Sequence, residues 1–144
     1  MQKIKVKKLN PEAIIPSYGH PGDAGLDIYS AEDFVLTHEM RHAVSTGISM
    51  ELPEGYVALV WDKSGLAAKK GITVLGGVID AHYRGEYKII LYNTEIDDFI
   101  IRKGDKIAQV LIQPIETAII EEVNELSETS RGEGRFGSTG GSNI

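Results

Sequence analysis

The feature that most limits the fold of this chain is a series of short apolar segments rich in Val, Ile and Tyr, each closed by Gly, Pro, Asn or Asp. Such segments are typical of β-strands bounded by turns. The clearest span residues 44–51, 56–61, 87–93 and 107–112, and weaker ones span residues 4–9, 26–29 and 99–101. Because hardly any helix separates them, the pattern predicts an all-β sandwich or jelly roll rather than a parallel α/β sheet.

Only one short helix is expected, at residues 64–70. Asp62 or Ser64 can act as its N-terminal cap, and Gly71 is a typical helix stop. The first turn of such a helix presents free backbone N–H groups, which suit a phosphate when a cation and a hydroxyl lie beside them. Lys63 and Ser64 supply these two groups, although an ordinary capped helix explains them equally well.

The length of 144 residues fits one domain with a sizeable core. The last sixteen residues hold five glycines and only two large apolar side chains, too little apolar surface to fold alone. We therefore divide the chain into a β domain, residues 1–128, and a flexible C-terminal tail, residues 129–144. Arg131, Phe136 and the closely spaced glycines of the tail suit a lid over a polyphosphate and a base, but also an ordinary linker.

The composition limits the compartment and the partners. There is no cysteine, so disulfides, thiolate zinc sites and cysteine nucleophiles are excluded. The N-terminus has no apolar run long enough for a signal peptide, and no other segment is long enough to span a bilayer. A net charge of -6 and a pI near 5.2 argue against gathering nucleic acid through the overall field. We therefore expect a cytoplasmic protein with neither membrane nor nucleic acid as a partner.

Residues 38–42 match the H-E-x-x-H pattern of zinc peptidases. In that chemistry one helix projects both imidazoles to a metal while the glutamate acts as the base. A helix over residues 31–43 can be imagined, but its β-branched residues favour a strand. A third ligand is also missing, because His20 and His82 lie in Gly- and Asp-rich turns. We interpret the match as a coincidence in a loop between strands.

Residues 76–86 (GGVIDAHYRGE) form a glycine-lined segment with an acid, an aromatic residue and a base. Its glycines let a ligand approach the backbone, whose N–H and C=O groups can then recognise the edge of a flat base. Asp80, at the mouth of the hairpin that we expect here, can orient and deprotonate a water molecule. From these residues alone, an ordinary hairpin turn is the simpler explanation.

Five segments together resemble, in order along the chain, the five motifs of trimeric dUTPases. They are residues 24–27 (AGLD), 63–67 (KSGLA), 77–85 (GVIDAHYRG), 104–109 (GDKIAQ) and 131–140 (RGEGRFGSTG). Similarity to this family implies a β jelly roll that forms a homotrimer and hydrolyses dUTP to dUMP and pyrophosphate with Mg²⁺, which limits uracil in DNA. It also implies three active sites at subunit boundaries, each closed by a tail from another chain.

The resemblance further implies roles for individual residues. Asp80 would activate the water that attacks the α-phosphorus, and Tyr83 would leave no room for a 2′-hydroxyl. Mg²⁺ would be held mainly by the phosphates, with Asp27 reaching it through water. The other implied substrate contacts are Lys63, Ser64, Gly65, Gly77, Val78, Ile79, Lys88, Gln109, Arg131, Phe136, Gly137 and Ser138.

Two positions depart from the pattern of the family. Lys63 stands where arginine is common, and a lysine cannot reproduce the bidentate contact of a guanidinium. Arg135 stands where glycine is common. Three rival interpretations remain: a dCTP deaminase of the same fold, a non-enzymatic trimeric binding module and the zinc peptidase. The arrangement from Asp80 to Tyr83 and the FGSTG sequence of the tail resemble dUTPases more closely than deaminases.

Overall fold

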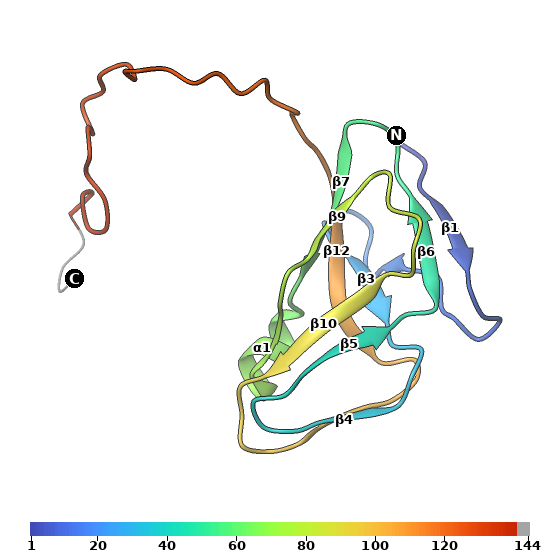
Figure 1. Cartoon of the computed structure of the whole chain (residues 1–144). Coiled ribbons are helices and arrows are strands. Elements are labelled where there is room, and N and C mark those ends of the chain that lie inside the picture. The colour runs from blue at the N-terminus through green and yellow to red at the C-terminus, as the bar shows by residue number, and fades with distance from the viewer. Residues whose placement is uncertain (141–144) are drawn as a thin grey trace.

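Twelve strands and one short helix make up the described part of the chain, residues 1–140, in this computed structural model. The strands are β1 (Lys5–Lys8), β2 (Ser17–Tyr18), β3 (Leu26–Tyr29), β4 (Phe34–Leu36), β5 (Arg41–Ser45), β6 (Ile48–Glu51), β7 (Tyr56–Trp61), β8 (Ile72–Val74), β9 (Val78–Asp80), β10 (Lys88–Asn93), β11 (Phe99–Ile101) and β12 (Lys106–Pro114). The helix is α1 (Ser64–Lys70). Figure 1 shows the strands gathered around one core, with α1 at one end and the segment after β12 leading away from it.

The strands form four sheets in which every pairing is antiparallel. The largest has the order β2-β3-β12-β7-β9, and the smaller ones have the orders β5-β10-β8, β1-β6 and β11-β4. Neighbouring strands are mostly remote in sequence, so the largest sheet brings distant parts of the chain side by side. The predicted all-β fold with one short helix is confirmed.

Strand β10 illustrates why these residues form strands. Ile89, Leu91 and Asn93 are buried, whereas the residues between them are more exposed, as expected when alternate side chains point to opposite faces. The one polar member of the buried face has its partners. The Asn93 amide donates hydrogen bonds of 2.9 Å to the carbonyl oxygens of Leu36 and Asp97, so its burial leaves no amide hydrogen unpaired.

The predicted single strand at residues 44–51 is wrong. A turn divides it into β5 and β6, because Gly47 has a φ of 68°, which a pleated strand does not allow. An isolated glycine within an apolar run does not reveal a positive φ. The other predicted strands are found at or near their expected positions, and the pattern does not predict β2, β4, β8 and β9.

Helix α1 covers the predicted residues and ends, as expected, at Gly71, whose φ is 61°. Its predicted cap is wrong, because Lys63 occupies the N-cap position without a side-chain cap hydrogen bond. The Asp62 carboxylate instead accepts hydrogen bonds of 2.7 Å from the Thr73 hydroxyl and the Val74 backbone N–H. It therefore ties the start of the helix to β8. No helix within residues 1–140 is both long and apolar enough to cross a membrane.

The H-E-x-x-H segment is not helical. His38 lies in a turn and its Nδ1 is 2.7 Å from the carbonyl oxygen of Glu95, while His42 lies in β5 and stacks on the Phe34 ring at 3.6 Å between centroids. The two imidazoles therefore have separate partners. Within residues 1–140, no three or more His, Cys, Asp or Glu side chains are grouped to hold a metal ion. The helical geometry that a zinc peptidase requires is not formed.

Candidate active site

The glycine-lined segment, residues 76–86, forms part of the wall of a cavity of about 520 Å³, which we name the β9–β10 cavity. The prediction that this segment is a hairpin is wrong. Strand β9 pairs with β7, whereas β10 pairs with β5 and β8, so the two strands lie in different sheets. The cavity is lined from both sheets. Its walls include six predicted site residues, namely Gly77, Val78, Ile79, Asp80, Tyr83 and Lys88.

Close contact with β7 fixes the backbone at the entrance to β9. Gly77 has a φ of 115°, and a Cβ atom there would lie 2.9 Å from the carbonyl oxygen of Val60. The Val60 N–H donates a hydrogen bond of 2.8 Å to the Gly77 carbonyl. Only glycine combines this dihedral angle with this approach. The backbone that leads to Val78 is therefore held in one position along the cavity wall.

Asp80 and Tyr83 face the cavity from the end of β9 and the turn that follows. Asp80 is exposed, and within residues 1–140 its carboxylate has no hydrogen bond or ion pair. The Tyr83 backbone N–H donates to the Asp80 carbonyl at 3.1 Å, and the Tyr83 hydroxyl donates to the Glu86 carbonyl at 3.0 Å. The carboxylate is thus free to act on a ligand, while the aromatic ring beside it is held.

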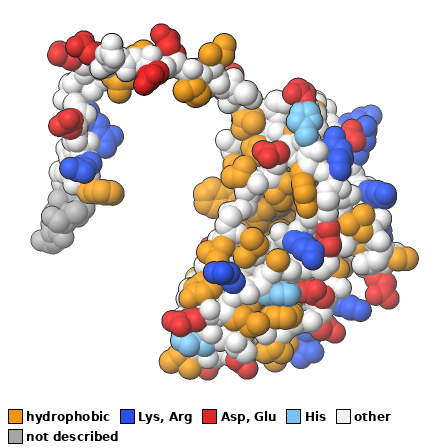
Figure 2. All heavy atoms as spheres, in the orientation of Figure 1, with side chains coloured by type: hydrophobic (Ala, Val, Ile, Leu, Met, Phe, Trp, Pro, Cys, Tyr) orange, Lys and Arg blue, Asp and Glu red, His pale blue; other side chains and the backbone are white. Residues whose placement is uncertain are grey.

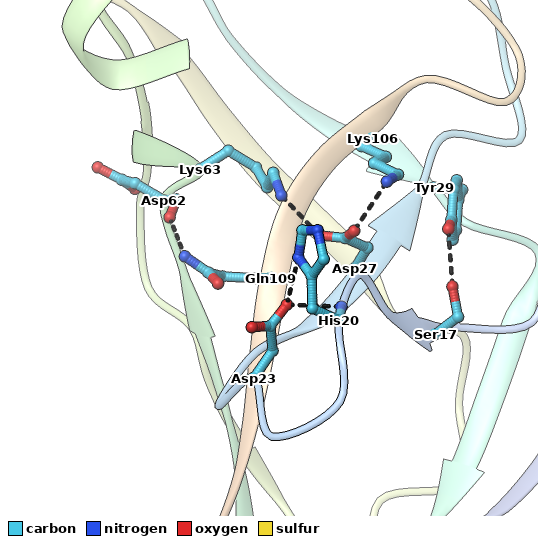
Figure 3. A network of polar contacts seen from close by, with 9 residues as sticks. All are labelled: Ser17, His20, Asp23, Asp27, Tyr29, Asp62, Lys63, Lys106 and Gln109. Atoms are coloured by element: carbon cyan, nitrogen blue, oxygen red, sulfur yellow. Dashed lines mark hydrogen bonds and ion pairs between the residues drawn. The ribbon is translucent and has the colours of Figure 1, made fainter. Parts of the chain in front are cut away.

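A second group of polar residues surrounds Asp27 in β3 (Figure 3). Lys63 Nζ lies 2.6 Å from one carboxylate oxygen of Asp27, and Lys106 Nζ lies 3.0 Å from the other. The side chain of Asp27 is only 8% exposed. This burial raises the pKa of Asp27, but the two lysines lower that pKa by more, so it lies below its usual range. Asp27 is therefore ionised at neutral pH and neutralised by two cations.

Gln109 joins this group from β12. It lies opposite Asp27 in the register of β12 with β3, and its side-chain amide donates a hydrogen bond of 2.8 Å to the Asp62 carbonyl. A Cβ atom at position 25 would collide with the Gln109 side chain, so Gly25 leaves the space that this side chain fills. The Asp27 cluster, as we name it, consists of Asp27, Lys63, Lys106 and Gln109, with Ser64 and Gly65 at the adjoining start of α1.

The two groups are separated along the largest sheet. Asp80 lies opposite Val57 of β7, whereas Gln109, on the other side of β7, lies opposite Trp61, four residues further along. With a rise of ~3.3 Å per residue and ~4.8 Å between strands, Asp80 and Gln109 are about 16 Å apart. One copy of the chain therefore brings the predicted residues together as two groups rather than as one site.

Comparison with known proteins identifies the family. A family model described as dUTPase matches residues 11–140. The chain belongs to the dUTPase family. It is 51% identical over 142 residues to the deoxyuridine 5'-triphosphate nucleotidohydrolase of Clostridioides difficile, covering 97% of this chain and 99% of that protein. It is 52% identical over 140 residues to the protein of the same name from Paramecium bursaria Chlorella virus 1, again covering 97% and 99%.

Solved structures agree with this assignment. The dUTPase of Staphylococcus bacteriophage 80alpha, determined with dUpNHpp, has a TM-score of 0.87 and 32% sequence identity over 97% of this chain and 99% of that chain. A dUTPase from phage phi11 of S. aureus, described for the coordination of a structural Mg(II) ion, has a TM-score of 0.82 and 30% identity over 88% and 99%. The predicted family is therefore confirmed.

The predicted tail residues of this dUTPase-family chain meet neither group. The hydrogen bonds found in residues 129–140 join residues of the same segment, among them one of 2.9 Å from Arg131 Nε to the Gly134 carbonyl. Phe136 is 95% exposed. Figure 2 shows the segment after β12, through residue 140, as an arm that extends from the body of the molecule. One copy therefore leaves Arg131, Phe136, Gly137 and Ser138 away from both groups.

Two residues that are not among the predicted site residues also belong to these groups. Lys106 neutralises Asp27, and Glu86 lines the β9–β10 cavity. Lys106 lies within one of the five dUTPase-like segments, but its contact depends on the pairing of β3 with β12. Glu86 bonds to a turn some 40 residues earlier. Neither contact leaves a local signal in the sequence.

Proposed function

We propose that this protein hydrolyses dUTP to dUMP and pyrophosphate. The observation that carries the proposal is the β9–β10 cavity, in which the unpartnered carboxylate of Asp80 lies beside the fixed backbone that leads from Gly77 into β9. That backbone offers N–H and C=O groups to the edge of a flat base. Membership of the dUTPase family supports uracil as the base and a triphosphate as the reacting group.

Asp80 acts as the general base in this proposal. A carboxylate with no competing partner can accept a proton from a water molecule that it orients. As the oxygen of that water bonds to the α-phosphorus, the bond breaks between the α-phosphorus and the oxygen that bridges it to the β-phosphorus. Pyrophosphate leaves with that bonding pair, and dUMP remains. Positioning and charge neutralisation supply most of the acceleration in phosphoryl transfers of this kind.

Recognition of the sugar falls to Tyr83. Its hydroxyl is bonded to the Glu86 carbonyl and its ring lies against Gly85, and these two contacts hold the ring at the wall of the cavity. A deoxyribose fits against such a fixed ring, whereas a 2′-hydroxyl requires space that the ring occupies. Lys88 and the residues of β9 complete the contacts to the nucleoside.

The Asp27 cluster suits the triphosphate. Lys63, Gln109 and the start of α1 provide a cation and polar hydrogens for phosphate oxygens. Mg²⁺ in nucleotide enzymes is usually held by one or two carboxylates together with substrate phosphates and water. Asp27 is a single buried carboxylate whose charge two lysines already balance, so it suits an ion that arrives with the triphosphate as its main ligand, with Asp27 acting only through water. When bound, the ion would neutralise charge on the phosphate oxygens.

The active protein is a homotrimer in this proposal. A general base must lie within about 3 Å of its water, or act through one further water, and Asp80 lies too far from the Asp27 cluster of its own copy. A complete site then combines Asp80 of one copy with the Asp27 cluster of another. Three such contacts close into a ring, and Arg131, Gly137, Ser138 and Phe136 of a tail close each site.

One experiment separates this proposal from its rivals. The protein is incubated with dUTP, dCTP and UTP in the presence of Mg²⁺, and pyrophosphate and ammonia are measured. We expect pyrophosphate from dUTP, far less from UTP, and no ammonia. Ammonia from dCTP would identify a deaminase, and no turnover of any nucleotide would identify a binding module. Mass measurement by light scattering should give three chains for each particle.

A further inference from the structure

Glu86 connects the β9–β10 cavity to a distant turn. One oxygen of its carboxylate accepts hydrogen bonds from the hydroxyl of Ser45, the last residue of β5, and, at 2.9 Å, from the backbone N–H of Gly47 in the turn between β5 and β6. The side chain is half-buried and lines the cavity. Burial raises the pKa of Glu86, but the hydrogen bonds from Ser45 and Gly47 and the charge of Lys88 lower that pKa by more. The carboxylate is therefore charged at neutral pH.

The next residue is bound to the same turn through its backbone. The Tyr87 N–H donates a hydrogen bond of 2.8 Å to the Ile48 carbonyl, and the Thr46 hydroxyl donates to the Tyr87 carbonyl. Tyr87 is also fully buried. Position 87 is thus anchored without any help from the Glu86 carboxylate. Removing that carboxylate should therefore loosen the loop before position 87 and leave β10 in place.

Glu86 also fixes the Tyr83 ring. The Tyr83 hydroxyl donates to the Glu86 backbone carbonyl at 3.0 Å. A Cβ atom at Gly85 would collide with the Tyr83 hydroxyl, so the end of the ring rests directly on the backbone of Gly85. The position of the ring therefore depends on where the backbone of residues 85 and 86 lies. The Glu86 carbonyl shares a planar peptide with the Tyr87 N–H, which is bonded to Ile48, so that bond fixes one side of residue 86. The Glu86 carboxylate, held by two donors, fixes the other side and with it the loop that carries Gly85.

We propose that Glu86 is a positioning residue for sugar discrimination, holding the Tyr83 ring where it excludes a 2′-hydroxyl. The inference rests on the proposed role of Tyr83. Without the carboxylate, the Gly47 N–H loses its acceptor, which is costly for a buried donor, and residues 81–86 gain freedom to move. Asp80 keeps its place because β9 remains paired with β7, opposite Val57. Loss of Glu86 should therefore affect the choice between dUTP and UTP more than the turnover of dUTP.

The test compares Glu86→Ala, Glu86→Gln and Ser45→Ala in the full-length protein. For each variant, kcat and KM are measured with dUTP and with UTP. Glu86→Ala should lower the ratio of kcat/KM for dUTP to that for UTP by about tenfold, a part of the roughly hundredfold by which an apolar wall can reject an added hydroxyl group. Glu86→Gln keeps an oxygen that both donors can reach and should retain most of the ratio. Ser45→Ala removes one donor and should fall between them.

A matched control is Glu32→Ala. Glu32 is also half-buried, and its carboxylate contacts His42 at the other end of β5. We expect this variant to lose stability without changing the dUTP to UTP ratio. Hydrogen exchange of the free protein adds a structural measurement. Residues 81–86 should exchange faster in Glu86→Ala than in the wild type, and at the wild-type rate in Glu32→Ala.

The outcomes separate this inference from the proposed function. A wild-type protein that discriminates between dUTP and UTP, with a folded Glu86→Ala variant that discriminates equally well, overturns the role of Glu86 alone. A wild-type protein that does not discriminate overturns the proposed role of Tyr83 and this inference with it. If Glu86→Ala does not fold, Ser45→Ala decides, because an unchanged ratio in that variant contradicts the role of Glu86.

Discussion

A mixture of two impaired variants tests whether each active site is shared between copies. Asp80→Asn removes the proposed base from the β9–β10 cavity. Lys63→Ala removes a cation from the Asp27 cluster but leaves Lys106, 3.0 Å from the carboxylate, to neutralise Asp27. Asp80→Asn neutralises a side chain and Lys63→Ala shortens one, and neither change alters a strand. Each variant alone should form oligomers and hydrolyse dUTP poorly.

The recovery expected from mixing follows from the distance of about 16 Å between Asp80 and Gln109 in one copy, which a general base cannot span. An intact site needs Asp80 from a Lys63→Ala chain and Lys63 from an Asp80→Asn chain. At equal amounts each choice has a probability of one half, so about one quarter of the sites in randomly mixed rings should be intact. Recovery should decline symmetrically as the ratio departs from one to one. If one copy supplied both residues, no intact site would form.

The assay measures pyrophosphate release from dUTP after the two variants have been dissociated together and reassembled. Different affinity tags and native mass spectrometry establish that mixed oligomers have formed. Wild type mixed with Asp80→Asn serves as the control, because its activity should fall in proportion to the wild-type fraction. Proven mixed oligomers with no more activity than the two variants separately would refute the sharing of sites. High activity of Lys63→Ala alone would instead remove Lys63 from phosphate binding.

Four further outcomes are expected. Asp80→Asn should lower kcat by roughly a hundredfold to ten-thousandfold while dUpNHpp still binds in calorimetry, and near-normal turnover would remove Asp80 from its role. Tyr83→Ala should raise kcat/KM for UTP relative to dUTP, whereas an equal loss with both substrates would show that the ring is only structural. Deletion after Glu128 should leave a folded oligomer with little activity, because the ordering of a glycine-rich lid must be driven by the ligand; full activity of the deletion would contradict the lid. The lysines hold the pKa of Asp27 below its usual range, so this ion pair stabilises the fold at neutral pH and is lost as the pH falls below about 3.9 and through the lowered value. Thermal unfolding should therefore show Asp27→Asn less stable than wild type at pH 7 and similar to it near about pH 2, and an equal difference at both pH values would contradict the ion pair as the cause.

The elements that can be predicted from the sequence are those with a local cause. Alternation in β10 and the apolar run in β7 are properties of consecutive side chains, so the strands are found where the pattern places them. The end of α1 is equally local, because Gly71 takes a left-handed conformation that few other residues adopt. The dUTPase-like segments are local as well, and they identify the family.

The parts that the sequence does not reveal depend on contacts between distant residues. The sequence around Asp62 is typical of a helix cap. In the folded chain, however, the Asp62 carboxylate binds Thr73 and Val74 of β8 instead. Residues 76–86 resemble a hairpin, but β7 provides a better partner for β9 than β10 does. The hydrogen bond from the Gly47 N–H to the Glu86 carboxylate likewise forms only when the turn at Gly47 is in place. In each case tertiary pairing overrides the local preference.

Lys63 stands where the resemblance to trimeric dUTPases implies arginine, and its contacts give a physical account of the difference. In this structure the carboxylate of Asp27 is divided between two lysines, with Lys63 on one oxygen and Lys106 on the other. A planar guanidinium tends to engage both oxygens of a carboxylate at once, which would compete with Lys106 for Asp27. A single ammonium on a flexible stem holds one oxygen and can move to a phosphate while Lys106 keeps Asp27 neutralised. The departure from the family pattern is therefore compatible with the proposed phosphate contact, because Lys106 keeps Asp27 neutralised when Lys63 turns to a phosphate.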